Sequence, residues 1–102
     1  MKKSNFENLQ IYQLSEKLAD RVWRAVICWD NISRDTLGKQ LVRAVDSVGA
    51  NIAEGSGRGT DAELRRFLRI SRGSLYETRH WLRCAYKRRL LTEKQVSELV
   101  PI

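Results

Sequence analysis

The chain has 102 residues, with 19 Lys and Arg against 12 Asp and Glu, which gives a formal net charge of +7. Hydrophobic residues make up 42% and one proline is present, a composition that excludes low-complexity and disordered classes and permits a compact core. No apolar run approaches the roughly 20 residues of a membrane helix, and no secretory signal follows the N-terminus. We therefore predict one domain over residues 1–102 with no membrane segment.

Residues that carry chemistry are few. Cys28, Cys84 and a single histidine, His80, are too few for a structural zinc site, and free thiols favour a cytoplasmic location. Glu16 and Asp20 are spaced to touch a metal from one helix face, but no further inward carboxylates are evident. We expect no metal, no cofactor and no enzymatic activity.

Helix-start signals divide the chain into segments. Capping-box patterns begin at Ser4, Thr60 and Thr92, and a further cap is expected at Ser33 or Asp35. Turn-forming residues occupy positions 30–34 and 55–59. The glycine-rich segment 55–59 follows no predicted strand and lacks the P-loop pattern, so it is not expected to bind a nucleotide. We interpret it as a glycine turn that ends a helix. The predicted helices span 5–29, 35–55, 61–89 and a short segment from 93.

Apolar residues recur at steps of three and four in each predicted long helix, as on a helix face that packs into a core. These core stripes are Ile11, Leu14, Leu18, Val22, Ala25 and Trp29; Leu37, Leu41, Ala44, Val45, Val48 and Ile52; and Leu64, Phe67, Leu68, Ser71, Leu75, Thr78, Leu82 and Ala85. Short loops make sequential helices antiparallel. The fold class is therefore predicted as all-α, an antiparallel up-down four-helix bundle with a short fourth helix.

The first and third long helices carry more apolar surface than one core face requires. The surplus residues are Leu9, Tyr12, Ala19, Trp23, Val26 and Ile27 on the first helix, and Ile70 and Trp81 on the third. The fourth segment or a second subunit would have to cover them, because small monomers rarely expose such patches. We predict a homo-oligomer with Tyr12, Trp23, Ile70 and Trp81 at the interface.

The net charge is concentrated on the third long helix. Residues 58–89 hold ten Lys and Arg against three acids, while the rest of the chain is neutral overall. Six of these cations fall within an arc of about 80° on a helical wheel. We call them the basic stripe: Arg65, Arg69, Arg72, Arg79, Arg83 and Lys87. The stripe is interpreted as a nucleic-acid-binding face, as a solvated face, or as a set of ion pairs with Glu16, Asp20 and Asp46.

The middle of the chain resembles a known family. The segments that carry the resemblance are 40–55, QLVRAVDSVGANIAEG; 63–78, ELRRFLRISRGSLYET; and the opening 5–9, NFENL, with Gln13. They are similar to the four-helix bundle proteins encoded in 23S rRNA intervening sequences. The resemblance implies an up-down bundle that assembles into a pentameric barrel, with no enzymatic activity. It also implies a distant relationship to the accessory protein of diversity-generating retroelements, a basic pentamer that works with a reverse transcriptase and nucleic acid.

The centre of that motif also has a physical interpretation in this chain alone. Gly49 and Ala53, one turn apart, allow a neighbouring helix to approach closely, while Asn51 and Glu54 are expected to hydrogen-bond across an interface or cap the next turn. The sequence departs from the family pattern after position 92, where a full fourth helix is expected to be missing.

Two functions follow from these observations. The first is a nucleic-acid-binding accessory or scaffold protein, with RNA slightly favoured because Tyr76 and Tyr86 lie near the basic stripe and could stack on bases. The alternative is a protein–protein adaptor whose basic stripe docks an acidic partner, such as a reverse transcriptase or nuclease.

Overall fold

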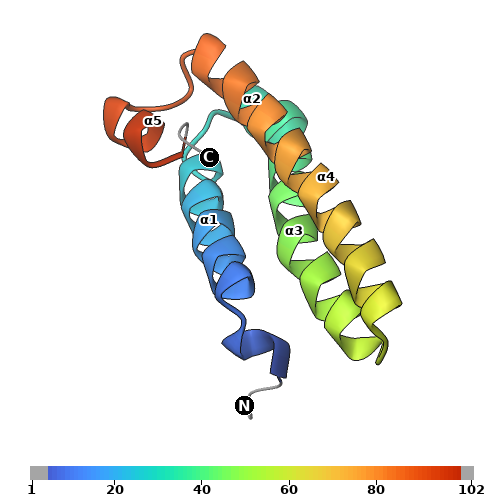
Figure 1. Ribbon diagram of the computed structural model, residues 1–102. Coiled ribbons are helices and arrows are strands. Elements are labelled where there is room, and N and C mark those ends of the chain that lie inside the picture. Colours follow the sequence, from blue (N-terminus) through green and yellow to red (C-terminus); the bar gives the residue numbers. More distant parts are fainter. Residues whose placement is uncertain (1–4, 100–102) are drawn as a thin grey trace.

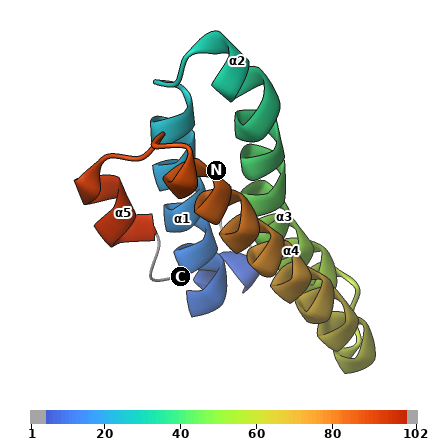
Figure 2. The same ribbon diagram turned by 90° about the horizontal axis from the view of Figure 1, so that it is seen from above.

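The computed structural model describes residues 5–99, and every regular element in that range is helical. The long helices are α1 (Gln10–Val26), α3 (Lys39–Gly57) and α4 (Asp61–Lys87), preceded by the 3₁₀ turn η1 (Asn5–Asn8). They run up, down and up, with α3 packed against both of the others (Figures 1 and 2). The prediction of an all-α, antiparallel arrangement is confirmed, and the capping box expected at Ser4 lies outside the described residues.

The short helix α5 (Glu93–Leu99) closes one end of the arrangement. It begins with a full capping box, in which Thr92 Oγ1 accepts from the Gln95 N–H (3.2 Å) and Gln95 Oε1 accepts from the Thr92 N–H (2.9 Å). Its Leu99 side chain is almost fully buried in the main core cluster, beside Val22 and Leu41. The four helices therefore form a bundle that α5 closes only near the C-terminal end of α1 (Figure 1).

The predicted helix starting near position 35 begins earlier than expected. A single turn, α2 (Asn31–Ser33), leads into the π-helical segment η2 (Arg34–Gly38), which continues directly into α3. The expected cap at Ser33 or Asp35 is therefore wrong, and Asp30 occupies the N-cap position with extended backbone. The polar composition of residues 30–34 predicted a loop, but residues 31–34 are helical and form the first turn of this longer helical segment.

The other boundaries are also shifted. Leu9 has extended backbone and separates η1 from α1, and α1 ends at Val26 rather than at position 29. The glycine-rich turn is shorter than predicted, because α3 continues to Gly57 and the chain reverses around Gly59, whose φ of 85° is in the left-handed region. Thr60 then caps α4, accepting from the Glu63 N–H at 3.2 Å.

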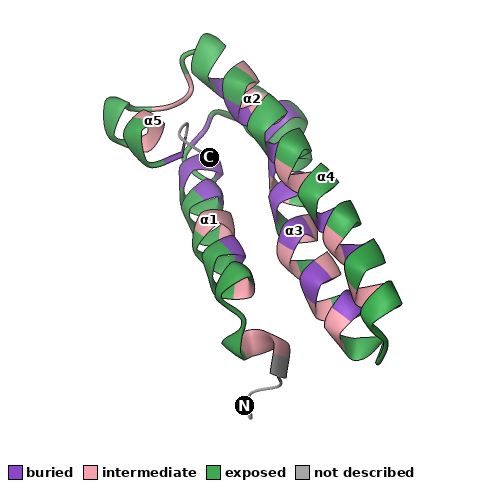
Figure 3. Ribbon diagram, viewed as in Figure 1, coloured by how far each residue is buried: buried purple, intermediate pink, exposed green. Residues whose placement is uncertain are grey.

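The core follows the predicted stripes of α3 closely and that of α1 only in part. Leu37, Leu41, Val45, Val48 and Ile52 are all buried. In contrast, Ile11 is 48% exposed and Leu14 is 55% exposed, so their assignment to the core is wrong. Both lie on the half of α1 that α5 does not reach, where the bundle has no fourth helix among the described residues to pack on them (Figure 3).

Candidate nucleic-acid interface

The basic stripe lies along the outward side of α4. All six of its residues are exposed, whereas the opposite side of the helix, including Phe67, Thr78 and Leu82, is buried against the rest of the bundle (Figure 3). From Arg65 to Lys87 the stripe covers 22 helical steps, or about 33 Å of helix axis. The structure therefore brings all six predicted residues onto one continuous face.

The described part of the chain neutralises none of these six cations. Its salt bridges join Arg34 to Asp35, Arg58 to Glu54 and Arg66 to Glu63, at 3.9, 3.0 and 3.3 Å between nitrogen and oxygen. The alternative pairing of the stripe with Glu16, Asp20 and Asp46 is not formed within residues 5–99. The guanidinium groups are thus left to bind water, ions or a ligand.

Two exposed aromatic rings accompany the stripe. Tyr76 and Tyr86 are both more than half exposed, on the same helix and at angles on the helical wheel that fall within or beside the stripe. An exposed phenol beside a guanidinium offers a flat surface for a nucleobase next to a partner for its phosphate. The arrangement of cations and exposed tyrosines therefore suits a nucleic acid, which offers both phosphates and bases.

The predicted interface residues of α1 lie on its flank toward α3. Tyr12 packs edge-on against Phe6 (ring centroids 4.9 Å apart) and lines a shallow pocket with Gly49 of α3. Trp23 is 56% exposed and lines a second hollow with Val42, also of α3. The close helix approach predicted at Gly49 is present, because a Cβ added there would lie 2.9 Å from Ser15 Oγ.

The predicted interface residues of α4 have different surroundings. Ile70 is exposed, whereas Trp81 is partly buried against the core cluster and donates from Nε1 to Glu77 Oε2 at 3.1 Å. The segment α5 does not cover Trp23 or Ile70, which stay exposed in the single chain. Their role at a subunit interface remains a prediction.

The polar residues of the family-like motif form local contacts. Asn51 Nδ2 donates to the Ser47 carbonyl at 2.8 Å, and Glu54 pairs with Arg58 at the end of α3. Both interactions stay within one helix and its terminus. Neither contact crosses to another helix, and Glu54 binds the Arg58 side chain rather than a backbone group of the next turn.

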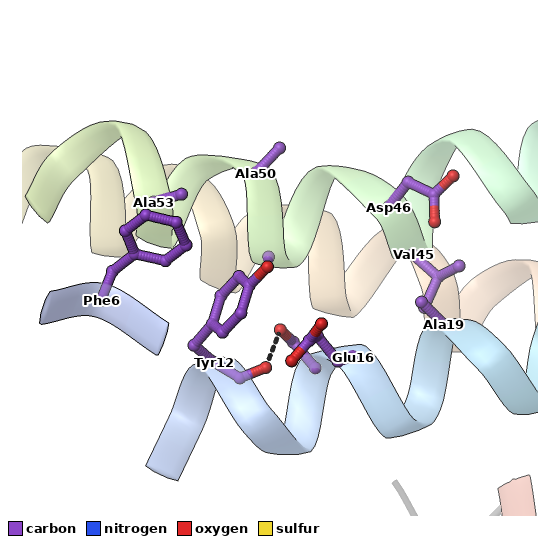
Figure 4. Close-up of a pocket in the computed structure, with 10 residues that line it drawn as sticks. Phe6, Tyr12, Glu16, Ala19, Val45, Asp46, Ala50 and Ala53 are labelled. Carbon is purple, nitrogen blue, oxygen red and sulfur yellow. Dashed lines mark hydrogen bonds between the residues drawn. The ribbon is translucent and has the colours of Figure 1, made fainter. Parts of the chain in front are cut away.

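The pocket between α1 and α3 gathers acidic groups at its edge (Figure 4). Burial raises the pKa of Asp46, and the nearby Asp20 carboxylate raises it further. Burial also raises the pKa of Tyr12, with Glu16 and then Glu7 adding to the effect. Each shift has an ordinary cause in desolvation and like charge.

The remaining chemistry-bearing residues of the described chain are dispersed. Cys28 and Cys84 are both free, and His80 Nε2 lies 3.8 Å from the Cys84 sulfur. No cluster of three or more His, Cys, Asp or Glu side chains is placed to hold a metal within residues 5–99. Over the same range, no helix combines the length and apolar character needed to cross a membrane.

One surface feature was not anticipated from the sequence. A groove lies between α1 and α4 with α3 at its base, and Ile11 and Leu14 are on one wall. The described helix α5 has seven residues, against 17, 19 and 27 in α1, α3 and α4, and it covers only one end of these helices. The periodicity of α1 alone does not reveal the groove, because a groove wall and a core face have the same spacing.

Comparison with known proteins identifies the family. The family model described as 23S rRNA-intervening sequence protein matches residues 7–101, nearly the whole chain. A search of curated proteins returns no significant match. The matched range takes in all four α-helices that form the bundle and the whole basic stripe. The chain therefore belongs to the 23S rRNA-intervening sequence protein family.

Proposed function

We propose that this protein is a non-enzymatic, homo-oligomeric accessory or scaffold protein that binds the phosphate backbone of nucleic acid through the basic stripe. The observation that carries the proposal is the stripe itself, six exposed cations on one face of α4 with no salt bridge inside the described chain. Like charges one helical turn apart, such as Arg65 and Arg69, repel one another, so a bound polyanion would relieve a strain that the fold carries.

The chemistry of the stripe favours phosphate and RNA. Five of its six members are arginine, whose planar guanidinium binds phosphate oxygens in a bidentate manner. The exposed rings of Tyr76 and Tyr86 favour single-stranded or looped RNA, whose bases are free to stack. The family description refers to sequences that interrupt 23S rRNA, and it names no ligand.

Assembly would strengthen this binding. The family resemblance and the exposed Trp23 and Ile70 support a pentameric barrel, in which each subunit adds its own +7 to a common field. The free thiols of Cys28 and Cys84 support a cytoplasmic location. No groove-reading element is evident, so binding would depend little on base sequence.

The test is the salt dependence of binding to a fluorescent single-stranded RNA. Wild type should bind with an affinity that falls steeply with salt, since each phosphate neutralised contributes about 0.7 to the log–log slope. The triple variant Arg69→Gln, Arg72→Gln, Arg79→Gln should lower the magnitude of that slope by about 2. The matched control Arg24→Gln, Arg43→Gln, Lys94→Gln removes the same charge from exposed positions off the stripe and should leave the slope near that of wild type.

The same experiment distinguishes the adaptor alternative, which the unpaired stripe also supports. If wild type fails to bind RNA even at about 50 mM salt, where electrostatic binding is strong, the nucleic-acid proposal is wrong. Capture of an acidic protein such as a reverse transcriptase, lost in the stripe variant and kept in the control variant, would then establish the adaptor function.

A further inference from the structure

Trp23 of α1 lines a small hollow beside the turn of the chain from α1 into α3, which we call the Trp23 hollow. Its volume is about 380 Å³, and the helical segments that lead into α3 lie at its edge (Figure 2). Its floor includes the buried residues Val26 and Gly38. A Cβ added at Gly38 would lie 2.7 Å from Val26 Cγ1, so the glycine permits this close approach. A cavity of this size accommodates a small molecule.

The π-helical segment η2 changes which charged residues surround the hollow. In a regular α-helix, positions 34 and 39 would be about 140° apart, because each residue turns the helix by about 100°. In η2 the Lys39 N–H instead donates to the Arg34 carbonyl, five residues back, and the wider turn brings these two residues closer to one face. Arg43 follows Lys39 by one α-helical turn and continues that face. All three side chains are exposed and line the hollow.

The hollow carries a net positive charge. Its three cations are accompanied by one lining carboxylate, that of Asp35. Arg34 is oriented by a hydrogen bond from its Nη2 to Asn31 Oδ1 (2.7 Å), and its Nε lies 3.9 Å from Asp35 Oδ1. Lys39 and Arg43 make no salt bridge within the described chain. Two cations are therefore left to bind an anionic group.

Apolar side chains complete the rim of the hollow. Trp23 and Ile27 of α1 are one helical turn apart and are 56% and 47% exposed. Val42 lines the hollow from α3. An exposed indole beside aliphatic side chains is a surface on which a planar ring stacks. The hollow therefore combines a surface for a flat ring with cations for an anion.

We propose that the Trp23 hollow binds a 5′-nucleotide, either free or as the phosphorylated 5′ end of a nucleic-acid strand. The base stacks on Trp23, and the phosphate accepts hydrogen bonds from Lys39 and Arg43. Charge complementarity selects a phosphate over a neutral ring compound, and the indole selects a phosphate that carries a ring. The proposal goes beyond backbone binding by the basic stripe, which lies on α4 and shares no residue with the hollow.

The first test compares three ligands by equilibrium dialysis against the full chain: 5′-AMP, adenosine and ribose 5-phosphate. 5′-AMP should bind at least about tenfold more tightly than either of the others, because each of these lacks one of the two contacts. Binding of 5′-AMP should also quench tryptophan fluorescence, since Trp23 is the most exposed of the three tryptophans.

Variants test the two contacts separately. Lys39→Gln with Arg43→Gln should weaken 5′-AMP binding by about tenfold or more and leave adenosine binding unchanged. Trp23→Leu should weaken 5′-AMP and adenosine alike and leave ribose 5-phosphate unchanged. The matched control Arg24→Gln with Lys94→Gln removes the same charge from exposed positions outside the hollow and should bind 5′-AMP as wild type does. Circular dichroism should be unchanged in all three, since every substituted side chain is exposed.

Two short single-stranded RNAs distinguish the two sources of the nucleotide. They have one sequence and differ only in carrying a 5′-phosphate or a 5′-hydroxyl. Both are measured on the variant Arg69→Gln, Arg72→Gln, Arg79→Gln, in which backbone binding by the stripe is reduced. Tighter binding of the phosphorylated strand would assign the hollow to a strand end. Equal binding of the two strands, together with tight 5′-AMP binding, would assign it to a free nucleotide.

Three results contradict the proposal. The first is no binding of 5′-AMP to wild type, which would leave the hollow to a neighbouring subunit, since Trp23 is also a predicted interface residue. The second is equal binding of 5′-AMP and ribose 5-phosphate. The third is 5′-AMP binding that the stripe variant loses and the variant at Lys39 and Arg43 keeps. Failure of RNA binding alone, with 5′-AMP binding retained, would affect only the proposed function.

Discussion

At the scale of single residues, two glycines inside helices have opposite surroundings. A Cβ at Gly55 of α3 would lie 2.7 Å from the Phe67 Cβ of α4, close to the backbone of the same helix at Leu64. A Cβ at Gly73 would meet nothing within 4 Å. Gly55 is therefore required by the close packing of α3 on α4, and Gly73 is not.

Alanine substitutions should separate these two cases. Gly55→Ala should lower the free energy of unfolding by about 1–3 kcal/mol through overpacking. Gly73→Ala should raise it by about 0.5–1 kcal/mol, because alanine loses less backbone entropy in a helix. Urea denaturation followed by circular dichroism measures both. Stabilisation by Gly55→Ala would mean that the α3–α4 approach is looser than described.

Asp46 gives a pH-dependent prediction. Its pKa is raised above 3.8 by burial and by Asp20, so the folded state binds the proton more tightly than the unfolded state. The ionised Asp46 carboxylate therefore lowers the stability of the folded state, and this loss is complete once the pH exceeds the folded pKa. Below pH 3.8 the side chain is protonated in both the folded and the unfolded state, so the loss disappears. Asp46→Asn should raise the melting temperature at pH 7 and leave it unchanged at pH 3.

A second carboxylate variant checks the cause. Asp20→Asn removes the like charge and should raise the melting temperature at pH 7 by a smaller amount, because burial is the larger contribution at Asp46. A lower melting temperature for Asp46→Asn at pH 7 would show that the carboxylate makes a favourable contact instead.

At the scale of elements, the sequence predicts the starts of α4 and α5 and the core face of α3 well. The two starts carry strong local signals, the Thr60 and Thr92 capping boxes. The apolar stripe of α3 is buried between α1 and α4. Periodicity fails for Ile11 and Leu14 because it marks an apolar face without showing whether anything packs on it. The π-helical turn before α3 has no comparable sequence signature, so the earlier helix start was missed.

The cap of α5 has consequences beyond its own seven residues. A helix this short is not stable alone, so its order depends on the reciprocal Thr92–Gln95 hydrogen bonds and on burial of Leu99. Thr92→Ala should destabilise the protein by about 1 kcal/mol and increase hydrogen exchange in α5 first. Exchange that rises equally in α3 and α4 would show that α5 does not open as a separate unit.

At the scale of the whole molecule, the sequence predicts the position of the basic stripe, but it does not predict that the stripe lacks salt bridges within the described chain. Helical spacing alone places six cations on one face of α4. Whether carboxylates on α1 and α3 reach that face depends on how the helices are rotated in the bundle. Asp20 and Asp46 instead lie near each other between α1 and α3, which leaves the stripe unpaired within the described chain.

Assembly is the prediction that depends on the whole surface. Trp23 and Ile70 are exposed on different helices, and buried aromatic side chains dominate protein interfaces. Light scattering at micromolar concentration should give a mass well above the 11.9 kDa of one chain, with five copies as the expected number. Trp23→Gln with Ile70→Gln should reduce that mass toward a single chain and leave helicity intact, since neither side chain is buried in the monomer. Ile32→Gln removes an even more exposed aliphatic side chain, from α2, and should leave the assembly unchanged. A wild-type mass of one chain would mean that these apolar residues face water or another partner, and the field of the basic stripe would then be that of a single +7 subunit.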